Sequence, residues 1–265
     1  MRFADHALAR RLEAADAEKH VRFVEARSRL ATGEICGVIQ VGGGVGAFAG
    51  TGIPYSRAVG LGLGSPVSDE ELDQLAAFYQ ARGAAACVSL CPLAAQEMIR
   101  RLGERGYRLD HPMHTWFREL QSGWSYPPPP PQLSVRVIVG GEEPRWVQTA
   151  LDLDISPPPD SVVSTVPHMR GASAYLASIA DEPAGAGMML VHEGVACLFS
   201  GNTRVRFRQQ GLQHALLAAR LSDAASQGCD LAMVHTEPGS PSQRNVERMG
   251  FRLAYTLFRL ERPPD

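Results

Sequence analysis

No other segment limits the folding of this 265-residue chain as strongly as its five consecutive prolines, Pro127–Pro131. Proline has no backbone N–H and its ring fixes φ, so the run cannot continue a helix or form a central strand. It is instead a stiff, extended spacer. The run lies midway between two globular patterns, so we expect one unit over residues 1–126, a linker over 127–132 and a second unit over 133–265. A ligand for a proline-recognising module is the alternative interpretation, which this position disfavours.

The two halves of the chain follow the same order of segments. In the first, Gly83 precedes an apolar run, a helical pattern and the pair Gly106-Tyr107. In the second, Gly228 precedes an apolar run, a turn, a helical pattern and the pair Gly250-Phe251. Each half then ends in a strand-like segment, His114–Leu120 or Tyr255–Glu261. The shared order predicts a duplication. The alternative is a chance similarity in the turns that separate helices and strands in any α/β protein.

Apolar periodicity predicts the secondary structure of each half. In the first half we expect helices at 5–30 and from Ser68, with extended regions at 35–50 and 57–63. Ser68 and Glu71 fit the capping box S-x-x-E. In the second half we expect strands at 135–139, 173–180, 195–203 and 230–236, helices at 144–151, 161–171 and 212–226, and a loop at Pro157–Pro159. This order predicts an α/β fold with a mixed, mostly antiparallel sheet flanked by helices in each unit.

Charge and composition exclude several classes of protein. The formal net charge is −2 and the pI is near 6.5, whereas a general nucleic-acid-binding protein presents a basic surface. No apolar run is long enough to span a membrane, and the charged N-terminal segment lacks the apolar core of a secretory signal. The five cysteines are odd in number and scattered, which is typical of reduced thiols. We therefore expect a cytoplasmic protein without a nucleic-acid or membrane partner.

The strongest chemical signal is the segment RQQGLQHALL, which begins at Arg208 between an expected strand and an expected helix. A helix N-terminus presents unpaired N–H groups and the positive end of the helix dipole. Gly211 has no Cβ, so an anion can approach the backbone closely, and Arg208 adds a positive charge. The segment therefore predicts a pyrophosphate site, although it lacks the lysine of a P-loop. An ordinary helix start with an exposed arginine is the alternative.

Other patterns indicate structure more than chemistry. The glycine-rich segment Val41–Ala47 leads into no helix, so a strand or hairpin is expected in place of a dinucleotide site. His111 and His114 lack further ligands nearby in sequence, and no metal is expected. Cys87 and Cys91 are expected to be core thiols. The G-x-S-x-G elbow of a serine hydrolase does not occur in the sequence.

Residues 195–260 resemble the acetyl-CoA-binding core of the GNAT superfamily of N-acetyltransferases. The strand into RQQGLQ, the helix HALLAARLSDAASQG, the strand DLAMVHT and the segment SPSQRNVERMGFRLAYTLFRLE carry this resemblance in order. It implies that the CoA pyrophosphate binds at Arg208, Gln209, Gln210, Gly211, Leu212, Gln213 and His214. It implies further that the backbone of Thr203 and Val205 bonds the pantetheine arm, and that Ser242 and Asn245 help to close the site. Gln213 departs from the Gly or Ala of many members, but glutamine is compatible with a helix.

Residues 30–120 resemble a second, degenerate unit of the same kind. At the position of the pyrophosphate loop this unit has Gly64–Glu71, which contains no arginine. Its three carboxylates, Asp69, Glu70 and Glu71, would stabilise the helix dipole but repel a pyrophosphate. We therefore expect two tandem GNAT-like units, of which only the second binds CoA.

The resemblance implies acetyl transfer from acetyl-CoA to an amine by direct attack in a ternary complex, without a metal. Many relatives supply the acid for the leaving thiolate from a tyrosine at the position of Val246. Since valine cannot donate a proton, the catalytic candidates are His235, Glu237 and Tyr255. The acceptor is expected to be a small-molecule or peptide amine, and the protein a monomer or homodimer. The alternative is a non-catalytic acyl-CoA-binding sensor or scaffold on the same fold.

Overall fold

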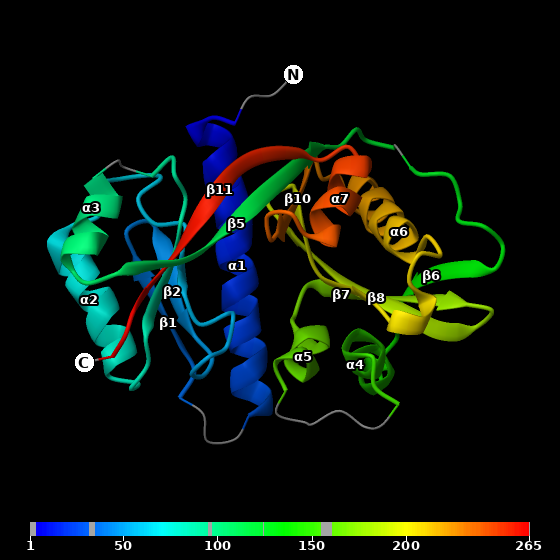
Figure 1. Cartoon of the computed structure of the whole chain (residues 1–265), viewed down its shortest axis with the longest axis horizontal. Helices are drawn as coiled ribbons and strands as arrows, with labels where there is room; N and C mark the ends of the chain where they lie inside the picture. Colours follow the sequence, from blue (N-terminus) through cyan, green and yellow to red (C-terminus); the bar gives the residue numbers. More distant parts are fainter. Residues whose placement is uncertain (1–3, 32–34, 95–96, 124, 155–160, 265) are drawn as a thin grey trace. The chain divides into compact units, whose positions relative to one another are not determined.

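The computed structural model describes residues 4–31, 35–94, 97–123, 125–154 and 161–264, which form two compact units (Figure 1). Unit 1 consists of Met1–Trp116, Thr236–Pro238 and Leu253–Asp265, and unit 2 of Phe117–His235 and Gly239–Arg252. Both units are thus discontinuous in sequence, unlike the units expected on either side of the proline run. The loop expected at Pro157–Pro159 lies outside the described residues.

Unit 1 is built from the first part of the chain and from its last strand. Its elements are α1 (His6–Leu30), β1 (Gly37–Val41), β2 (Gly44–Phe48), β3 (Ala58–Val59), α2 (Asp69–Gln80), β4 (Ala86–Leu90), α3 (Glu97–Glu104), most of β5 (Arg108–Glu119) and most of β11 (Arg252–Arg262). α1 confirms the helix expected at 5–30, and the side chain of Asp5 caps it. α2 confirms the expected capping box: the Glu71 N–H donates to Ser68 Oγ at 3.1 Å, and the Ser68 N–H donates to Glu71 Oε2 at 2.8 Å.

The sheet of unit 1 has the strand order β1-β2-β3-β4-β11-β5. β2 pairs antiparallel with β1 and β3, whereas β3 and β4 are parallel. Every residue of β2 is buried, because neighbouring side chains of a strand point to opposite faces and a helix covers each face. Val45 packs against Ala17 of α1, and Gly46 lies beneath Leu75 of α2.

The chain's last strand, β11, completes the sheet of unit 1. It pairs antiparallel with β4, in a register that runs from Phe258↔Leu90 to Arg262↔Ala86. The expected unit over 133–265 would have kept this strand with the second half of the chain. Its alternating apolar residues meet their partners in unit 1 instead, and residues from 253 onward belong there.

The glycine-rich segment near residue 44 forms a hairpin, as expected. Gly42 and Gly43 make the turn between β1 and β2 with φ values of 57° and 75°. A Cβ atom on Gly44 would lie 2.2 Å from the carbonyl oxygen of Val59 on the next strand. The glycine therefore permits close approach of two backbones.

Unit 2 contains the remaining elements. They are β6 (Leu133–Val137), α4 (Glu143–Leu151), α5 (Val162–Thr165), the 3₁₀ turn η1 (Val166–His168), β7 (Ala172–Ile179), β8 (Glu182–His192), β9 (Val195–Thr203), the 3₁₀ turn η2 (Val205–Phe207), α6 (Leu212–Ser226), most of β10 (Leu231–Thr236) and α7 (Pro241–Arg248). The strand expected at 195–203 and the helix expected at 212–226 are confirmed. The helix expected at 161–171 is shorter, because Pro167 lacks the N–H that another α-helical turn would need.

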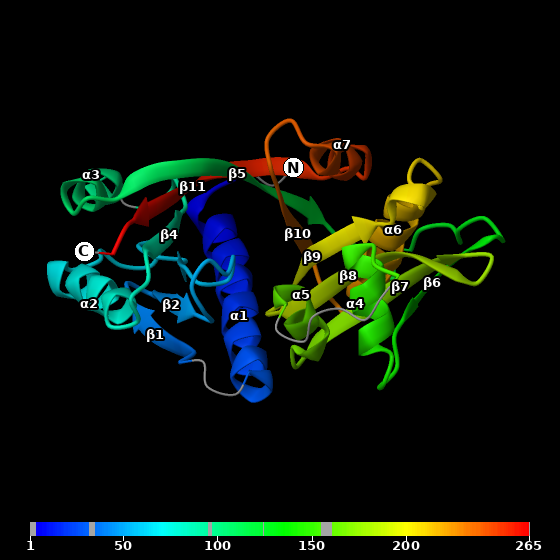
Figure 2. The same ribbon diagram turned by 60° about the horizontal axis from the view of Figure 1, so that its bottom comes forward.

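The sheet of unit 2 has the strand order β10-β9-β8-β7-β6. All its neighbours are antiparallel except β9 and β10, which are parallel. Ala184–Leu190 of β8 are all buried, because α4 and α6 cover the two faces of the sheet (Figures 1 and 2). The segment 205–211, between β9 and α6, is mostly exposed.

The two units repeat one pattern. In each, antiparallel strands lead into a strand, a helix and a parallel strand: β3, α2 and β4 in unit 1, and β9, α6 and β10 in unit 2. A further helix follows in both, α3 in unit 1 and α7 in unit 2, and the strand that comes after α7 in the chain is β11 of unit 1. The mixed sheets flanked by helices confirm the expected fold class and its tandem organisation.

The state of the cysteines and the polarity of the helices can be compared with what the sequence predicts. All five cysteines carry free thiols, and Cys91 is buried, as expected for a core thiol, which raises its pKa to about 12. Cys87 is only half-buried. Within the described ranges, every helix is too short or too polar to cross a membrane.

Replacing a buried residue of β11 should destabilise unit 1. Leu257 is 2% exposed and Leu253 of the same strand is 45% exposed. Leu257→Ala should lower the free energy of unfolding by about 2–5 kcal/mol, whereas the matched control Leu253→Ala should change it by less than about 0.5 kcal/mol. Hydrogen exchange should show faster exchange at Ala86–Leu90 in Leu257→Ala, and unchanged protection there would contradict this pairing.

Candidate functional site

The turn between β9 and α6 holds most of the predicted cosubstrate residues together in unit 2. β9 ends at Thr203, the turn η2 follows, and α6 begins at Leu212. Gly211 is the residue before the helix, with φ of 83°, and Gln209 also has a positive φ of 64°. The left-handed backbone at Gly211 turns the chain into the helix and suits glycine best.

The N-terminus of α6 is open to an anion. The first N–H groups of a helix have no partner within the helix. Gly211 supplies no side-chain cap to them. Arg208 is exposed beside this turn, and its Nε donates a 3.4 Å hydrogen bond to the carbonyl oxygen of Thr203. The turn therefore combines a guanidinium with the positive end of a helix dipole.

Two groups predicted to bind CoA, the Val205 N–H and the Gln213 side chain, already donate hydrogen bonds within the chain. The Val205 N–H donates to Asp152 Oδ2 at 2.9 Å, a bond that, with the Arg204 guanidinium, holds the pKa of Asp152 below its ordinary value. Gln213 Nε2 donates to Thr203 Oγ1 at 2.8 Å. A pantetheine arm bound at Val205 would have to displace the Asp152 carboxylate, so that contact stays a prediction.

The parallel strands β9 and β10 separate before they end. Their paired register stops at Leu198↔Val234, although β9 continues to Thr203 and β10 to Thr236. Ser200 of β9 has a positive φ of 48°, and the register between β8 and β9 shifts close by. The backbone of β9 beyond Leu198 thus has no pairing to β10.

A buried arginine of α6 lies at this irregular part of the sheet. Arg220 is 2% exposed, and its guanidinium donates to the carbonyl oxygens of Met188 at 3.1 Å and Leu216 at 3.0 Å. Burial lowers its pKa to about 10. A Cβ atom on Gly187 would lie 3.0 Å from the Arg220 guanidinium, so glycine makes room for the cation.

The other predicted residues of unit 2 lie on α7 and β10. Ser242 is exposed on the first turn of α7 and Asn245 is half-buried on the next. Val246, at the position of the usual tyrosine, is 2% exposed and packs into the core. His235 is half-buried near the end of β10. The cosubstrate roles of Ser242 and Asn245 and the catalytic role of His235 stay predictions.

The remaining catalytic candidates belong to unit 1. Glu237 is exposed in the turn after β10. Tyr255 is buried on β11, and its hydroxyl donates a 2.8 Å hydrogen bond to Glu13 Oε1 of α1. Burial and the neighbouring Glu13 carboxyl raise the pKa of Tyr255 well above its ordinary value. The phenol is therefore held in its protonated form, and its catalytic role is untested.

A buried cluster of ionisable side chains on α1 was missed by sequence reasoning. Glu13 has a pKa of about 8, raised first by burial and then by Asp16. The Nδ1–H of His20 donates to the carbonyl oxygen of Tyr55 at 2.9 Å, and burial lowers the pKa of His20 to about 3. Glu13, Asp16 and His20 recur at helical spacing beside buried apolar residues. That spacing, on the face that carries Leu12 and Ala9, is the signal that could have found them.

The N-terminus of α2 in unit 1 differs from that of α6. The Glu71 carboxylate accepts bonds from the N–H groups of Ser68 and Gly42, which hold its pKa below the ordinary value. Asp69 in the same turn pairs with Arg101 and Arg105. Carboxylates of the chain itself therefore occupy the place that an anion would take.

The two histidines of the H-x-x-H pattern contact side chains of unit 1. His111 Nδ1 lies 2.6 Å from Asp110 Oδ2, and His114 Nδ1 lies 2.9 Å from Thr256 Oγ1. In the part of the chain that the structure describes, no three His, Cys, Asp or Glu side chains group as metal ligands.

Glu13→Gln should change stability in a pH-dependent way. The pKa of Glu13 is raised from 4.5 to about 8 in the folded protein, so stability falls as pH rises from 4.5 through about 8. The neutral glutamine removes that loss, so the gain in unfolding free energy should be larger at about pH 9 than at about pH 6. Urea unfolding at both pH values, with the exposed Glu70→Gln as control, measures the difference. An equal gain at both values would show that Glu13 is already ionised.

Comparison with known proteins identifies the fold. No protein-family model and no curated protein match the chain in sequence. A GCN5-related N-acetyltransferase from Kribbella flavida matches with a TM-score of 0.66 and 19% identity over 94% of this chain and 96% of that one. A tandem GNAT protein from the clavulanic acid biosynthesis pathway, without acetyl-CoA, matches with a TM-score of 0.59 and 14% identity over 98% and 96%. A GCN5-related N-acetyltransferase from Sphaerobacter thermophilus has a TM-score of 0.53 and 16% identity, over 68% of this chain and 59% of that one.

The first two of these matches extend over almost the whole chain, so both units take part in the likeness. At such low identity the likeness concerns the fold, and it agrees with the resemblance of residues 195–260 and of the degenerate first half. The chain has the fold of the tandem GNAT acetyltransferases.

Proposed function

We propose that this protein is an acetyl-CoA-dependent N-acetyltransferase whose unit 2 holds the CoA pyrophosphate at the start of α6. The observation that carries the proposal is the contrast between two equivalent helix starts. α6 is preceded by Gly211, which has no side chain to cap the helix and lies near Arg208. α2, in contrast, begins with a complete capping box and three carboxylates. A pyrophosphate is favoured at the first start and repelled at the second.

The separation of β9 from β10 supports the same proposal. Backbone groups of β9 beyond Leu198 have no register pairing to β10. An extended amide-containing arm can bond to such a strand edge as an added strand would. Thr203, at the end of β9, is the residue that the resemblance assigns to the pantetheine arm.

The reaction needs a positioned amine and a polarised carbonyl. Acetyl-CoA supplies the activated acetyl group as a thioester. A backbone N–H of the irregular part of β9 would stabilise the negative charge that develops on the carbonyl oxygen, and the chain holds both reactants in one geometry. The amine must lose a proton and the thiolate must gain one, and His235 is the candidate of unit 2 for this transfer.

The acceptor is proposed to be a small-molecule or peptide amine. A non-catalytic acyl-CoA sensor is the second candidate, and it is favoured by Val246, which cannot donate a proton at the position where many relatives have a tyrosine. Both functions require acetyl-CoA binding, so binding and turnover have to be measured separately.

Arg208→Ala should weaken acetyl-CoA binding by about 1–3 kcal/mol, because it removes a charge-assisted contact. Isothermal titration calorimetry measures this, and the wild type should bind one acetyl-CoA per chain. Arg206→Ala is the matched control: Arg206 lies on the same turn, but its guanidinium pairs with Glu182. Equal affinity of wild type and Arg208→Ala would reject the role of Arg208. Two acetyl-CoA sites per chain would reject the prediction that unit 1 does not bind CoA.

Turnover separates the enzyme from the sensor. Release of the CoA thiol should exceed the rate of hydrolysis with at least one member of a panel of polyamines, aromatic amines, amino acids and peptide N-termini. A thiol-reactive dye follows the release, and Arg208→Ala should slow it at low acetyl-CoA concentration. Tight binding of acetyl-CoA without turnover on any amine would favour the sensor.

A further inference from the structure

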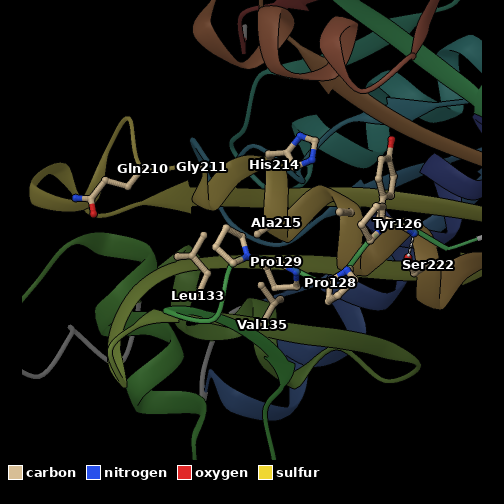
Figure 3. A pocket seen from close by; sticks show the side chains of 14 residues that line it. Tyr126, Pro128, Pro129, Leu133, Val135, Gln210, Gly211, His214, Ala215 and Ser222 are labelled. Atoms are coloured by element: carbon tan, nitrogen blue, oxygen red, sulfur yellow. Dashed lines mark hydrogen bonds between the residues drawn. The ribbon is translucent and has the colours of Figure 1, made fainter.

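A pocket of about 390 Å³ lies between the proline segment and α6 in unit 2 (Figure 3). Pro127–Pro130 line one side of it, and the opposite side is the face of α6 that carries Ala215, Ala218 and Ala219. Leu133 and Val135 of β6 also line it. The segment expected to serve only as a linker is thus the wall of a cavity, which we call the proline pocket.

The proline segment is fixed at both ends. The Tyr126 N–H donates to Ser222 Oγ of α6 at 3.0 Å, and the Tyr126 hydroxyl donates to the carbonyl oxygen of Met249 at 3.4 Å. At the other end the Leu133 N–H donates to the carbonyl oxygen of Pro130 at 2.8 Å. Between these points the prolines have no N–H to satisfy, so the segment can stand away from α6 without leaving donors unpaired. The cavity is therefore held open by rigid backbone and by small side chains of α6.

The lining determines which ligand the proline pocket can accept. Its lining residues, all within the described chain, include no Asp, Glu, Lys or Arg, so an apolar ligand body meets no buried charge. The apolar faces of the proline rings can stack on a planar ring, as can the rings of Tyr126 and His214, which meet edge to face at 5.8 Å.

Polar groups gather where α6 begins. Gln210 and Gly211 border the pocket there, and His214 lies one turn further along the helix (Figure 3). The positive end of the helix dipole favours a negative group at this end, and no carboxylate of the lining opposes it. The pocket thus has an apolar body and one weakly electropositive end.

We propose that the proline pocket binds a small aromatic carboxylate, with its ring between the prolines and α6 and its carboxylate toward Gly211 and His214. The volume of the pocket falls within the range of small-molecule sites, about 300–1,000 Å³. The rigid wall favours such binding, because little conformational freedom is lost when the ligand enters.

Calorimetric titration of the full chain with 2-naphthoate tests the proposal. The wild type should bind it at millimolar concentration or below, and more tightly than the uncharged 2-naphthamide. Ala219→Phe, which fills the pocket, should weaken binding at least about tenfold. The control Ala77→Phe makes the same change at an exposed position of α2 in unit 1 and should bind as the wild type does. Val135→Phe, from the β6 side, replaces Ala219→Phe if that variant does not fold.

Three results would overturn the proposal: no binding of 2-naphthoate by the wild type, undiminished binding by the filled variants, or equal binding of the amide. In a chain that also binds acetyl-CoA, saturating acetyl-CoA should weaken the binding of 2-naphthoate, because the pyrophosphate and the carboxylate would share Gly211 and His214. Binding of 2-naphthoate that acetyl-CoA leaves undiminished there would contradict this placement of the carboxylate. The proposal does not rest on the proposed function, because 2-naphthoate is titrated without acetyl-CoA. A chain that binds 2-naphthoate but not acetyl-CoA would contradict the proposed function alone.

Discussion

The pairing of β11 with β4 is the constraint on which the rest of unit 1 depends. It joins the last strand of the chain to β4, which ends at Leu90. β11 therefore lies inside the sheet and not at its edge. Such non-local pairing has a high entropic cost of closure, which only the burial of many side chains can offset. Tyr255 shows how far that burial reaches, because the same strand carries its hydroxyl to a carboxyl of the first helix.

The two units show how duplicated folds diverge through the chemistry of a helix start. The strand, helix and parallel strand are the same in both, and the difference lies in a few side chains. At α2 the helix dipole is satisfied by Ser68 and Glu71, which stabilises the fold and leaves no place for an anion. At α6 Gly211 leaves the same dipole open beside the exposed guanidinium of Arg208. Stability and ligand binding are thus alternative uses of one electrostatic feature.

Local patterns predicted most elements, and long-range contacts account for what they missed. β9 and α6 have the expected bounds because strand alternation, Gly211 and helical periodicity all act within a few residues. The partner of β11 could not be predicted, since its alternation is the same beside any apolar strand. Glu13 was missed because a carboxylate on a helix is usually solvated. The bond from Val205 to Asp152 depends on residues 53 positions apart, which no motif connects.

The buried guanidinium of Arg220 has a consequence for how this sequence can vary. Its donors reach backbone carbonyls only because residue 187 has no side chain, and any Cβ there would meet the cation. A larger residue at 187 would be accepted only together with a shorter one at 220, and a shorter residue at 220 would remove the side-chain donors from those carbonyls. Among relatives with the same bulge, the two positions should therefore covary, with arginine at one accompanied by glycine at the other.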